Sequence, residues 1–252
     1  MDFNRLRQSW QTAVENISIL RTTFHFSTDS GLWLQAVHST PMLDWTTNLS
    51  SSQDYKEGLR SFLQSVDFSE ETGFLRPPFR LRLFQSKQED SASTLVILMH
   101  HALYDGISVR KLLAAVENIY SGLPVISQVQ FYELLPHFMS QEKRGTFFWF
   151  NKIRRYKPAQ LPLIHPSTPS FVSSLAEITV PLDAAGLRNI ISQAGVTMQC
   201  IGQAAWAKLL SKHTGSLDVT FGHTVSGRGI PGAEDVIGPV LVSYFIPQRH
   251  NH

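Results

Sequence analysis

A run of strand length in which five of six residues are apolar, followed directly by two histidines, is the feature that most constrains how this chain can fold. Residues Thr94–Met99 read Thr-Leu-Val-Ile-Leu-Met. This length and composition predict a strand that is buried on both faces in the middle of a sheet. From Ile107 onward, apolar residues recur at helical spacing until Gly122, where a glycine ends the pattern. His100 and His101 therefore lie on a strand-to-helix connection, where α/β sheets tend to place ligand sites.

The patterns on either side predict an α/β protein with mixed sheets flanked by helices. Three-or-four spacing of apolar residues predicts a first helix over 2–17. Alternating residues around a Ser-Thr-Asp-Ser-Gly turn then predict a hairpin of strands 20–26 and 32–37. Further strands are expected over 79–85, 175–182 and 217–225, and further helices over 54–68, 141–156, 183–194 and 197–212, with Asp183 as an N-cap.

A segment rich in proline and serine divides the pattern into two parts. At 252 residues the chain is long enough for two half-size lobes. The segment 158–174 carries prolines at 158, 162, 166 and 169 and is interpreted as a linker. We therefore expect an N-terminal lobe over 1–157 and a second, incomplete lobe over 175–252.

Charge and cysteine usage exclude several classes of partner. The formal net charge is +2 and forms no basic stripe, so no nucleic acid partner is expected. No apolar stretch approaches the length of a membrane span, and the N-terminus lacks a signal-peptide pattern, which predicts no membrane association. The one cysteine, Cys200, fits a reducing, cytoplasmic setting and is expected to pack in the core. No GxGxxG, P-loop or CxxC pattern supports a dinucleotide, nucleotide or zinc site.

The pattern His100-His101-x-x-x-Asp105-Gly106 is the sharpest chemical feature. Histidine exchanges a proton at little cost near neutral pH, as acyl transfer to an amine or hydroxyl requires. Asp105 could accept a hydrogen bond from the imidazole or pair with an arginine and fix the loop. Gly106 is expected to permit a backbone turn that a side chain would obstruct. Two other interpretations remain open: ordinary hydrogen-bonded histidines, or half of a metal site, although no further ligand lies nearby at metal spacing.

The sequence resembles nonribosomal peptide synthetase condensation domains, which belong with the chloramphenicol acetyltransferase-like, CoA-dependent acyltransferases. Met99–Ser108 is similar to the family's MHHxxxDGxS motif, and Ile19–Phe24 to its LRTxF segment. Gly222–Arg228 resembles the strand that leads into the VSGR turn. Ile237–Arg249 resembles the IGxxxNxxPxR stretch. These motifs occur in the family's order and cover nearly the whole chain.

The resemblance implies a two-lobed α+β fold and an enzyme that forms peptide bonds. An amine carried by one carrier protein attacks an acyl or peptidyl thioester carried by another, and both substrates are held on phosphopantetheine arms. His101 would accept the amine's proton or stabilise the tetrahedral intermediate. His100, Asp105 and Gly106 would support the motif, with Arg21 as the expected partner of Asp105. The domain itself would bind no cofactor and no metal, and its partners would be the carrier and adenylation domains of a synthetase.

The resemblance also has departures and rivals. The family's opening helix and strand have no counterpart before Met1, and the part that follows the IGxxxNxxPxR stretch is missing, so a domain truncated at both ends is expected. Tyr104 and the sequence around the VSGR turn resemble the corresponding segments of fungal synthetases, including those that make hydroxamate siderophores. Two alternatives remain: a stand-alone CoA-dependent acyltransferase, and a noncatalytic remnant that docks a carrier protein.

Overall fold

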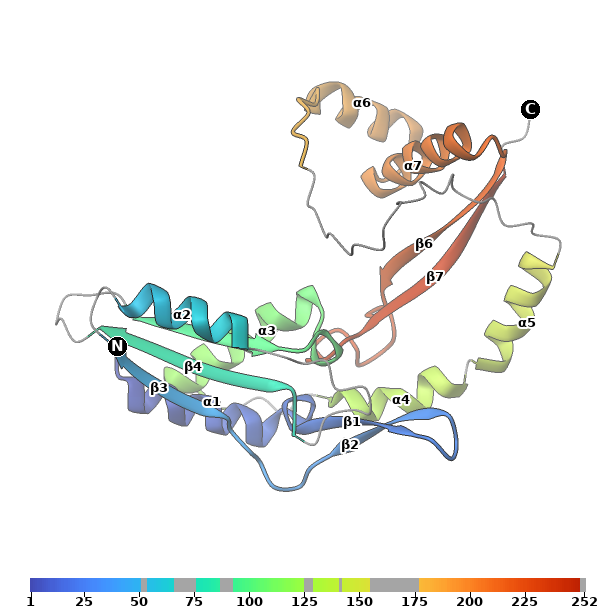
Figure 1. The fold of residues 1–252 in the computed structure, drawn as a ribbon. Helices are drawn as coiled ribbons and strands as arrows, with labels where there is room; N and C mark the ends of the chain where they lie inside the picture. The colour runs from blue at the N-terminus through green and yellow to red at the C-terminus, as the bar shows by residue number, and fades with distance from the viewer. Residues whose placement is uncertain are drawn as a thin grey trace, which may run out of the picture. The chain divides into compact units, whose positions relative to one another are not determined.

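The computed structural model describes residues 1–50, 54–65, 76–86, 93–124, 129–140, 142–154 and 177–249 (Figure 1). The chain forms two compact units. The first comprises Met1–Glu142 and Val225–Val242, and the second comprises Lys143–Thr224 and Ser243–His252. These units are divided differently from the lobes expected from sequence, because residues 225–242 belong to the first unit and the described residues 143–154 belong to the second. The expected linker over 158–174 lies outside the described residues.

A three-stranded sheet forms the centre of the first unit. Its strands are β3 (Trp45–Ser50), β4 (Phe79–Ser86) and β5 (Thr94–Met99), in the order β3-β4-β5. Strand β4 runs parallel to β3 and antiparallel to β5. Among the described strands β5 lies at the edge of this sheet, and all six of its residues are half-buried, so the prediction that 94–99 is a fully buried central strand is wrong. An apolar run predicts that the faces of a strand are covered. It does not predict the position of the strand in the sheet, because strand order depends on pairing with segments far away in sequence.

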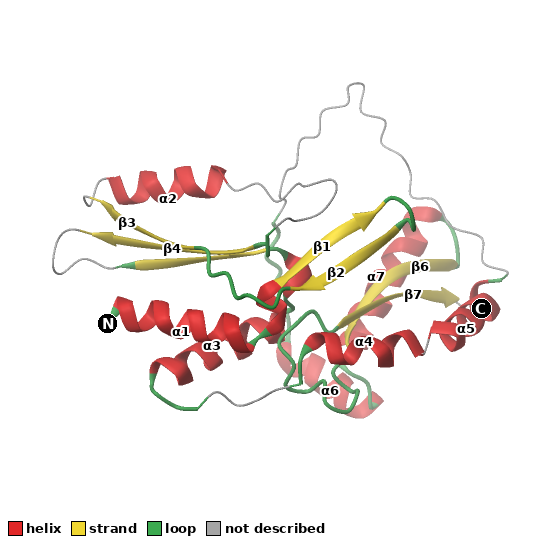
Figure 2. Ribbon diagram, turned by 90° about the horizontal axis from the view of Figure 1, so that it is seen from below, coloured by secondary structure: helices red, strands yellow, loops and turns green. Residues whose placement is uncertain are grey.

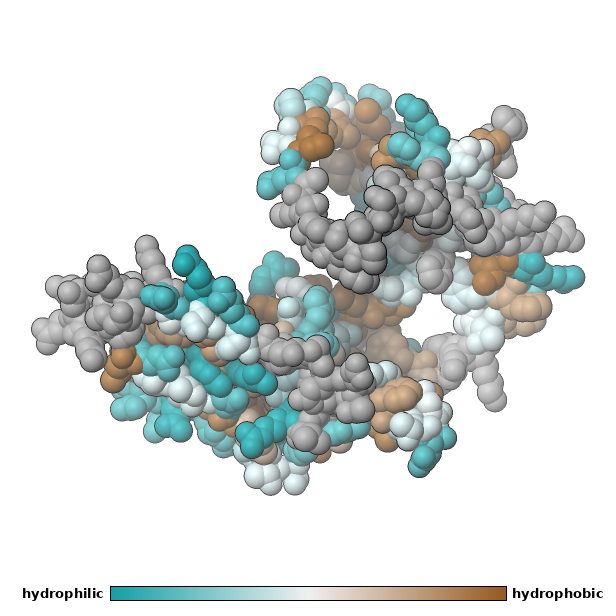
Figure 3. All heavy atoms as spheres, viewed as in Figure 1, coloured by the Kyte–Doolittle hydropathy of each residue, from teal (hydrophilic) through white to brown (hydrophobic). Residues whose placement is uncertain are grey.

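Helices cover both faces of this sheet (Figure 2). Helix α2 (Asp54–Ser65) lies on one face, where Phe62 and Phe84 bring their ring centroids within 6.0 Å. Its side of the unit is mostly hydrophilic in Figure 3, as expected for an amphipathic surface helix. On the opposite face, α1 (Phe3–Asn16) packs along α3 (Gly106–Tyr120).

The core of the first unit lies between these two helices and the sheet. Its fully or nearly fully buried side chains include Trp10, Val14, Leu20, Leu81, Leu103, Leu112 and Val116. The Trp10 ring contacts Phe79 at 5.7 Å between centroids. Helix α1 begins at an Asp2 N-cap, whose carboxylate accepts hydrogen bonds from the Asn4 and Arg5 amides at 2.9 and 3.0 Å.

A β-hairpin follows the first helix, as the alternation predicted. A short 3₁₀ helix, η1 (Ser18–Arg21), leads into β1 (Thr22–Ser27), which pairs antiparallel with β2 (Leu32–Val37). The hairpin turn includes Gly31 at a φ of 65°, a conformation that glycine adopts without strain. Helix α4 (Phe131–Ser140), which the sequence patterns did not predict, also belongs to this unit.

The second unit contains helices followed by part of a two-stranded sheet. Its elements are α5 (Glu142–Ile153), α6 (Ala184–Ala194), α7 (Met198–Thr214), and most of β6 (Asp218–Ser226) and β7 (Leu241–Arg249). Asp183 caps α6 as expected, accepting from the Ala185 and Gly186 amides. The expected strand over 175–182 is wrong for its described part, because residues 177–182 have no regular structure.

Two further expectations concern cysteine and membranes. Cys200 is exposed rather than packed in a core, and the Thr197 hydroxyl donates a hydrogen bond to its sulfur at 3.3 Å. The helical spacing of apolar residues around Cys200 does not produce a buried stripe, since Ala207 is the one residue of α7 that is fully buried. Across the described residues, no helix combines the length and apolarity that a membrane span needs.

Candidate active site

The histidine pair lies on a short, tightly held connection between β5 and α3. The backbone is extended at His100, forms one 3₁₀ turn, η2 (His101–Leu103), and is extended again at Tyr104. The His100 amide donates to the Pro78 carbonyl at 3.0 Å, which fixes the start of the connection to the strand beside it. The strand-to-helix position predicted from sequence is therefore confirmed.

His100 closes the turn with its own ring. Its Nδ1 atom accepts a hydrogen bond from the Ala102 amide at 3.2 Å, and its carbonyl accepts from Leu103 at 3.0 Å. Because the amide can only donate, Nδ1 is the acceptor of this hydrogen bond. His100 therefore contributes to the shape of the connection.

His101 differs from its neighbour because its side chain is exposed. Its ring stacks on Tyr104 with centroids 4.8 Å apart and an angle of 17° between the planes. An exposed imidazole on a fixed backbone can meet a substrate from solvent. This arrangement suits proton transfer, because the donor or acceptor must come within hydrogen-bond distance of a ring nitrogen.

Asp105 is buried, with 1% of its surface exposed, and serves as the N-cap of α3. Its carboxylate accepts from the Ile107 and Ser108 amides at 3.0 and 2.6 Å, and from the Val240 amide at 3.1 Å. Burial by itself raises the pKa of Asp105, but hydrogen bonds from Ser108 and the charge and hydrogen bond of Arg228 outweigh it, so the pKa is lowered. Asp105 is thus held as a carboxylate.

Arg228 is the cation that pairs with Asp105. Its Nη2 lies 3.1 and 3.0 Å from the two carboxylate oxygens, and its side chain is 8% exposed. Its Nη1 donates to the Ala233 and Val236 carbonyls at 3.1 and 2.7 Å. One guanidinium therefore ties the motif helix to the segment 228–236 that folds over it.

The prediction that Arg21 would pair with Asp105 is wrong. Arg21 ends η1 at the base of the hairpin, and its Nη1 donates to the His38 carbonyl just after β2. Arg228 was not singled out from the sequence. The sequence did offer a signal for this pairing, because Arg228 is the arginine of the segment that resembles the VSGR turn. An arginine in a turn that folds back to the histidine motif can meet a buried carboxylate there.

Ser108 completes the buried network. It is fully buried, and its hydroxyl oxygen lies 2.6 Å from the Asp105 carboxylate and 2.5 Å from the Gly238 carbonyl. The hydroxyl also accepts from the Gly238 amide at 3.1 Å and from Arg228 Nη2 at 3.1 Å. The residues Asp105, Ser108, Arg228 and Gly238 are called the Asp105 clamp below.

The role expected of Gly106 is wrong. Its φ is not positive, and a Cβ atom placed on it would meet no atom within 4 Å. Gly106 is the first residue of α3, a position that most residues adopt readily. Neither the turn nor the packing of this unit therefore requires glycine there.

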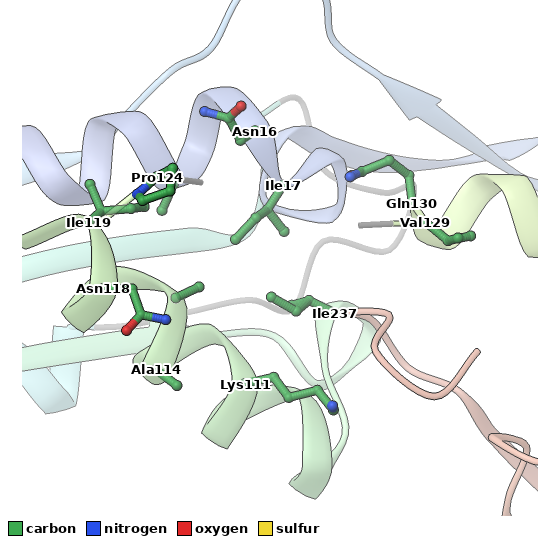
Figure 4. Close-up of a pocket in the computed structure, with 12 residues that line it drawn as sticks. Asn16, Ile17, Lys111, Ala114, Asn118, Ile119, Pro124, Val129, Gln130 and Ile237 are labelled. Carbon is green, nitrogen blue, oxygen red and sulfur yellow. The ribbon is translucent and has the colours of Figure 1, made fainter. Parts of the chain in front are cut away.

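A separate cavity of about 160 Å³ lies in the first unit (Figure 4). It is lined by parts of α1 and α3, including Asn16 and Asn118, and by Gln130 and Ile237. Gln130 accepts a hydrogen bond from the Ser18 amide at 2.8 Å, and Lys111 at the edge pairs with Asp235 at 2.6 Å. Its lining includes none of the histidine motif, so it is not assigned to the reaction.

Metal-ligating side chains do not gather within the described residues. No group of three histidine, cysteine, aspartate or glutamate side chains lies there in a position to hold an ion.

Comparison with known proteins identifies the family. The model of the condensation domain family matches residues 1–247. The chain belongs to the condensation domain family. It is 39% identical over 244 residues to the nonribosomal peptide synthetase NPS2 of Ceriporiopsis subvermispora, and the match covers 96% of this chain and 10% of that protein. It is also 39% identical over 243 residues to the coprinoferrin synthetase of Coprinopsis cinerea, again with 96% and 10% covered.

Solved structures agree with this assignment of the condensation domain. A crystal structure described as SeMet-CT superposes with a TM-score of 0.76 at 26% identity, covering 100% of this chain and 56% of that one. The condensation domain of the monacolin K polyketide synthase MokA shares the fold, with a TM-score of 0.74, 16% identity, and coverage of 100% and 60%. The predicted mixed α/β fold class is confirmed, and the chain spans little more than half of each of these two structures.

Proposed function

We propose that this condensation domain forms a peptide bond between an acyl or peptidyl thioester and an amine, each carried on the phosphopantetheine arm of a carrier domain. The supporting observation is that His101 is exposed while Asp105, four residues further along the chain, is buried in the Asp105 clamp at the start of α3. A rigid backbone that presents one free imidazole to solvent is what proton transfer to an external substrate needs.

The proposed chemistry needs only one proton carrier. The amine nitrogen attacks the thioester carbonyl, the tetrahedral intermediate collapses, and the carbon–sulfur bond breaks to release the donor thiol. The proton lost by the amine ends on the departing thiolate. His101 carries this proton, or as an imidazolium it donates a hydrogen bond to the oxyanion of the intermediate. Asp105 does not touch the reacting atoms in this proposal, because its oxygens are committed to Arg228, Ser108 and backbone amides.

The partners follow from the carrier-bound substrates. The domain would work with carrier and adenylation domains of a synthetase and would bind no cofactor of its own. Relatives include the ferrichrome siderophore peptide synthetase of Mycosarcoma maydis, 31% identical over 236 residues, with 92% of this chain and 6% of that protein covered. We assign this domain to a synthetase of the same siderophore-producing kind.

A condensation assay tests the proposal. A donor carrier loaded with an acyl group and an acceptor carrier loaded with an amino acid are mixed with the chain, and product is followed by mass spectrometry. We expect product from the unaltered chain and a loss of about 10²- to 10⁴-fold in His101→Ala. His137→Ala, which removes an exposed histidine of α4, is the matched control and should retain the rate.

The same assay separates the alternatives. Product from CoA thioesters but not from carrier-bound donors would identify a CoA-dependent acyltransferase instead. Carrier binding without product from any donor would identify a noncatalytic docking domain. Either result would overturn the proposed reaction.

A further inference from the structure

The imidazole of His101 is held from one side by an aromatic ring. Tyr104 stacks on it at 4.8 Å between centroids, with the planes 17° apart. In the part of the chain that the structure describes, no hydrogen bond or ion pair is made by the His101 ring. The stack with Tyr104 is therefore the interaction that sets the orientation of this exposed side chain.

The spacing of the two residues explains the stack. His101–Leu103 forms a single 3₁₀ turn, and Tyr104 is the extended residue that follows it, so the turn brings the chain back beside His101 three residues on. The backbone of Tyr104 is fixed on both sides, because Leu103 is fully buried and Asp105 is anchored in the clamp. Tyr104 is half-buried on this anchored backbone, whereas His101 is exposed and has the Tyr104 ring as its stacking partner.

We propose that Tyr104 is a positioning residue that holds the ring plane of His101 for reaction; this inference rests on the proposed function. An exposed histidine otherwise samples several staggered rotamers, and only some of them present a ring nitrogen to the substrate. Reaction rates depend strongly on such orientation. The contact uses the face of the tyrosine ring, so phenylalanine should replace it, whereas a residue without a ring should not.

Two variants and one control test the inference. Tyr104→Phe keeps the ring, Tyr104→Leu removes it, and Tyr132→Leu removes an exposed tyrosine of α4 away from the motif. In the NMR spectrum of the whole chain, the ring protons of His101 should be shifted upfield by the stacked ring. We expect this shift to persist in Tyr104→Phe and Tyr132→Leu and to disappear in Tyr104→Leu.

The kinetic expectation is a change in kcat with KM unchanged. Tyr104→Leu should lower kcat by roughly three- to ten-fold, as expected for the loss of one aromatic pair, and Tyr104→Phe should restore it. An active chain whose kcat is unaffected in Tyr104→Leu would overturn the positioning role while leaving the proposed function intact. If the unaltered chain and His101→Ala are equally inactive, the proposed function fails. The NMR comparison then still decides the stack, because an unchanged His101 shift in Tyr104→Leu would refute it.

Discussion

Replacing Arg228 by methionine is the perturbation that most directly tests the Asp105 clamp. The change keeps much of the side-chain volume but removes the cation that pairs with a carboxylate of 1% exposure. Breaking a buried ion pair by removing one partner typically costs about 3–5 kcal/mol, because the remaining charge is left buried without its counter-ion. The carbonyls of Ala233 and Val236, which accept from Arg228 at 3.1 and 2.7 Å, also lose this donor.

The contacts that Asp105 keeps after the substitution determine where the loss of stability falls within the range of about 3–5 kcal/mol. Its oxygens keep the amides of Ile107, Ser108 and Val240 after the substitution. These donors moderate the penalty, whereas the carbonyls of Ala233 and Val236, the shortest carbonyl contacts of Arg228, add to it at about 1 kcal/mol each. We therefore expect the free energy of unfolding to fall by about 3–4 kcal/mol, a large share of the roughly 5–15 kcal/mol of a typical domain.

Urea unfolding provides the assay. Trp10, which is buried in the core of the first unit, supplies a fluorescence signal for its unfolding. Lys111→Met is the matched control, since it breaks an ion pair of the same unit in which Asp235 is 77% exposed. Water and salt screen such a pair, so its loss should shift the midpoint far less. Equal shifts for Arg228→Met and Lys111→Met would refute the buried clamp.

Three further predictions concern the same unit. Because the pKa of Asp105 is lowered in the folded chain, its contribution to stability is present above the ordinary carboxyl pKa of about 4 and is lost as the pH falls through the lowered value. Urea midpoints measured from pH 6 to pH 3 should therefore fall more steeply for the unaltered chain than for Asp105→Asn. Gly106→Ala should leave the midpoint unchanged or raise stability by up to about 1 kcal/mol, since its Cβ meets nothing; a clear loss in the same assay would contradict this. Trp10→Ala should cost about 3–5 kcal/mol in thermal or urea unfolding followed by circular dichroism, because it empties a fully packed site. A cost below 1 kcal/mol would show that the core does not depend on this ring.

Local patterns in the sequence were sufficient for the elements around the site. Periodicity placed α1 and α3 within one or two residues, and the alternation around the 27–31 turn gave the hairpin. The Asp183 cap was readable because an N-cap acts on amides only two and three residues away. Each of these features depends on neighbours in sequence.

Features that depend on distant partners were not predictable in the same way. The strand order that leaves β5 at an edge is set by pairing with β4, which no local pattern encodes. Arg228, and not the expected Arg21, pairs with Asp105 because its segment folds over the start of α3. Arg228 is separated from its partner Ser108 by 120 residues in sequence. Strand β3 (Trp45–Ser50) was missed because its Trp-Thr-Thr-Asn-Leu-Ser sequence lacks an apolar run. Gly106 was misjudged in another way. The sequence suggested a backbone role for this glycine, but its φ is not positive and other residues can adopt it.

The single-turnover rate of peptide-bond formation in His101→Ala tests the central claim most directly. Donor and acceptor carriers are loaded beforehand, so the measured rate constant reports the chemical step rather than carrier supply. We predict a rate at least about 10²-fold below that of the unaltered chain, with both proteins showing the same urea midpoint because the exposed imidazole is not part of the core. An undiminished rate in His101→Ala would contradict the assignment of His101 as the group that carries the reaction.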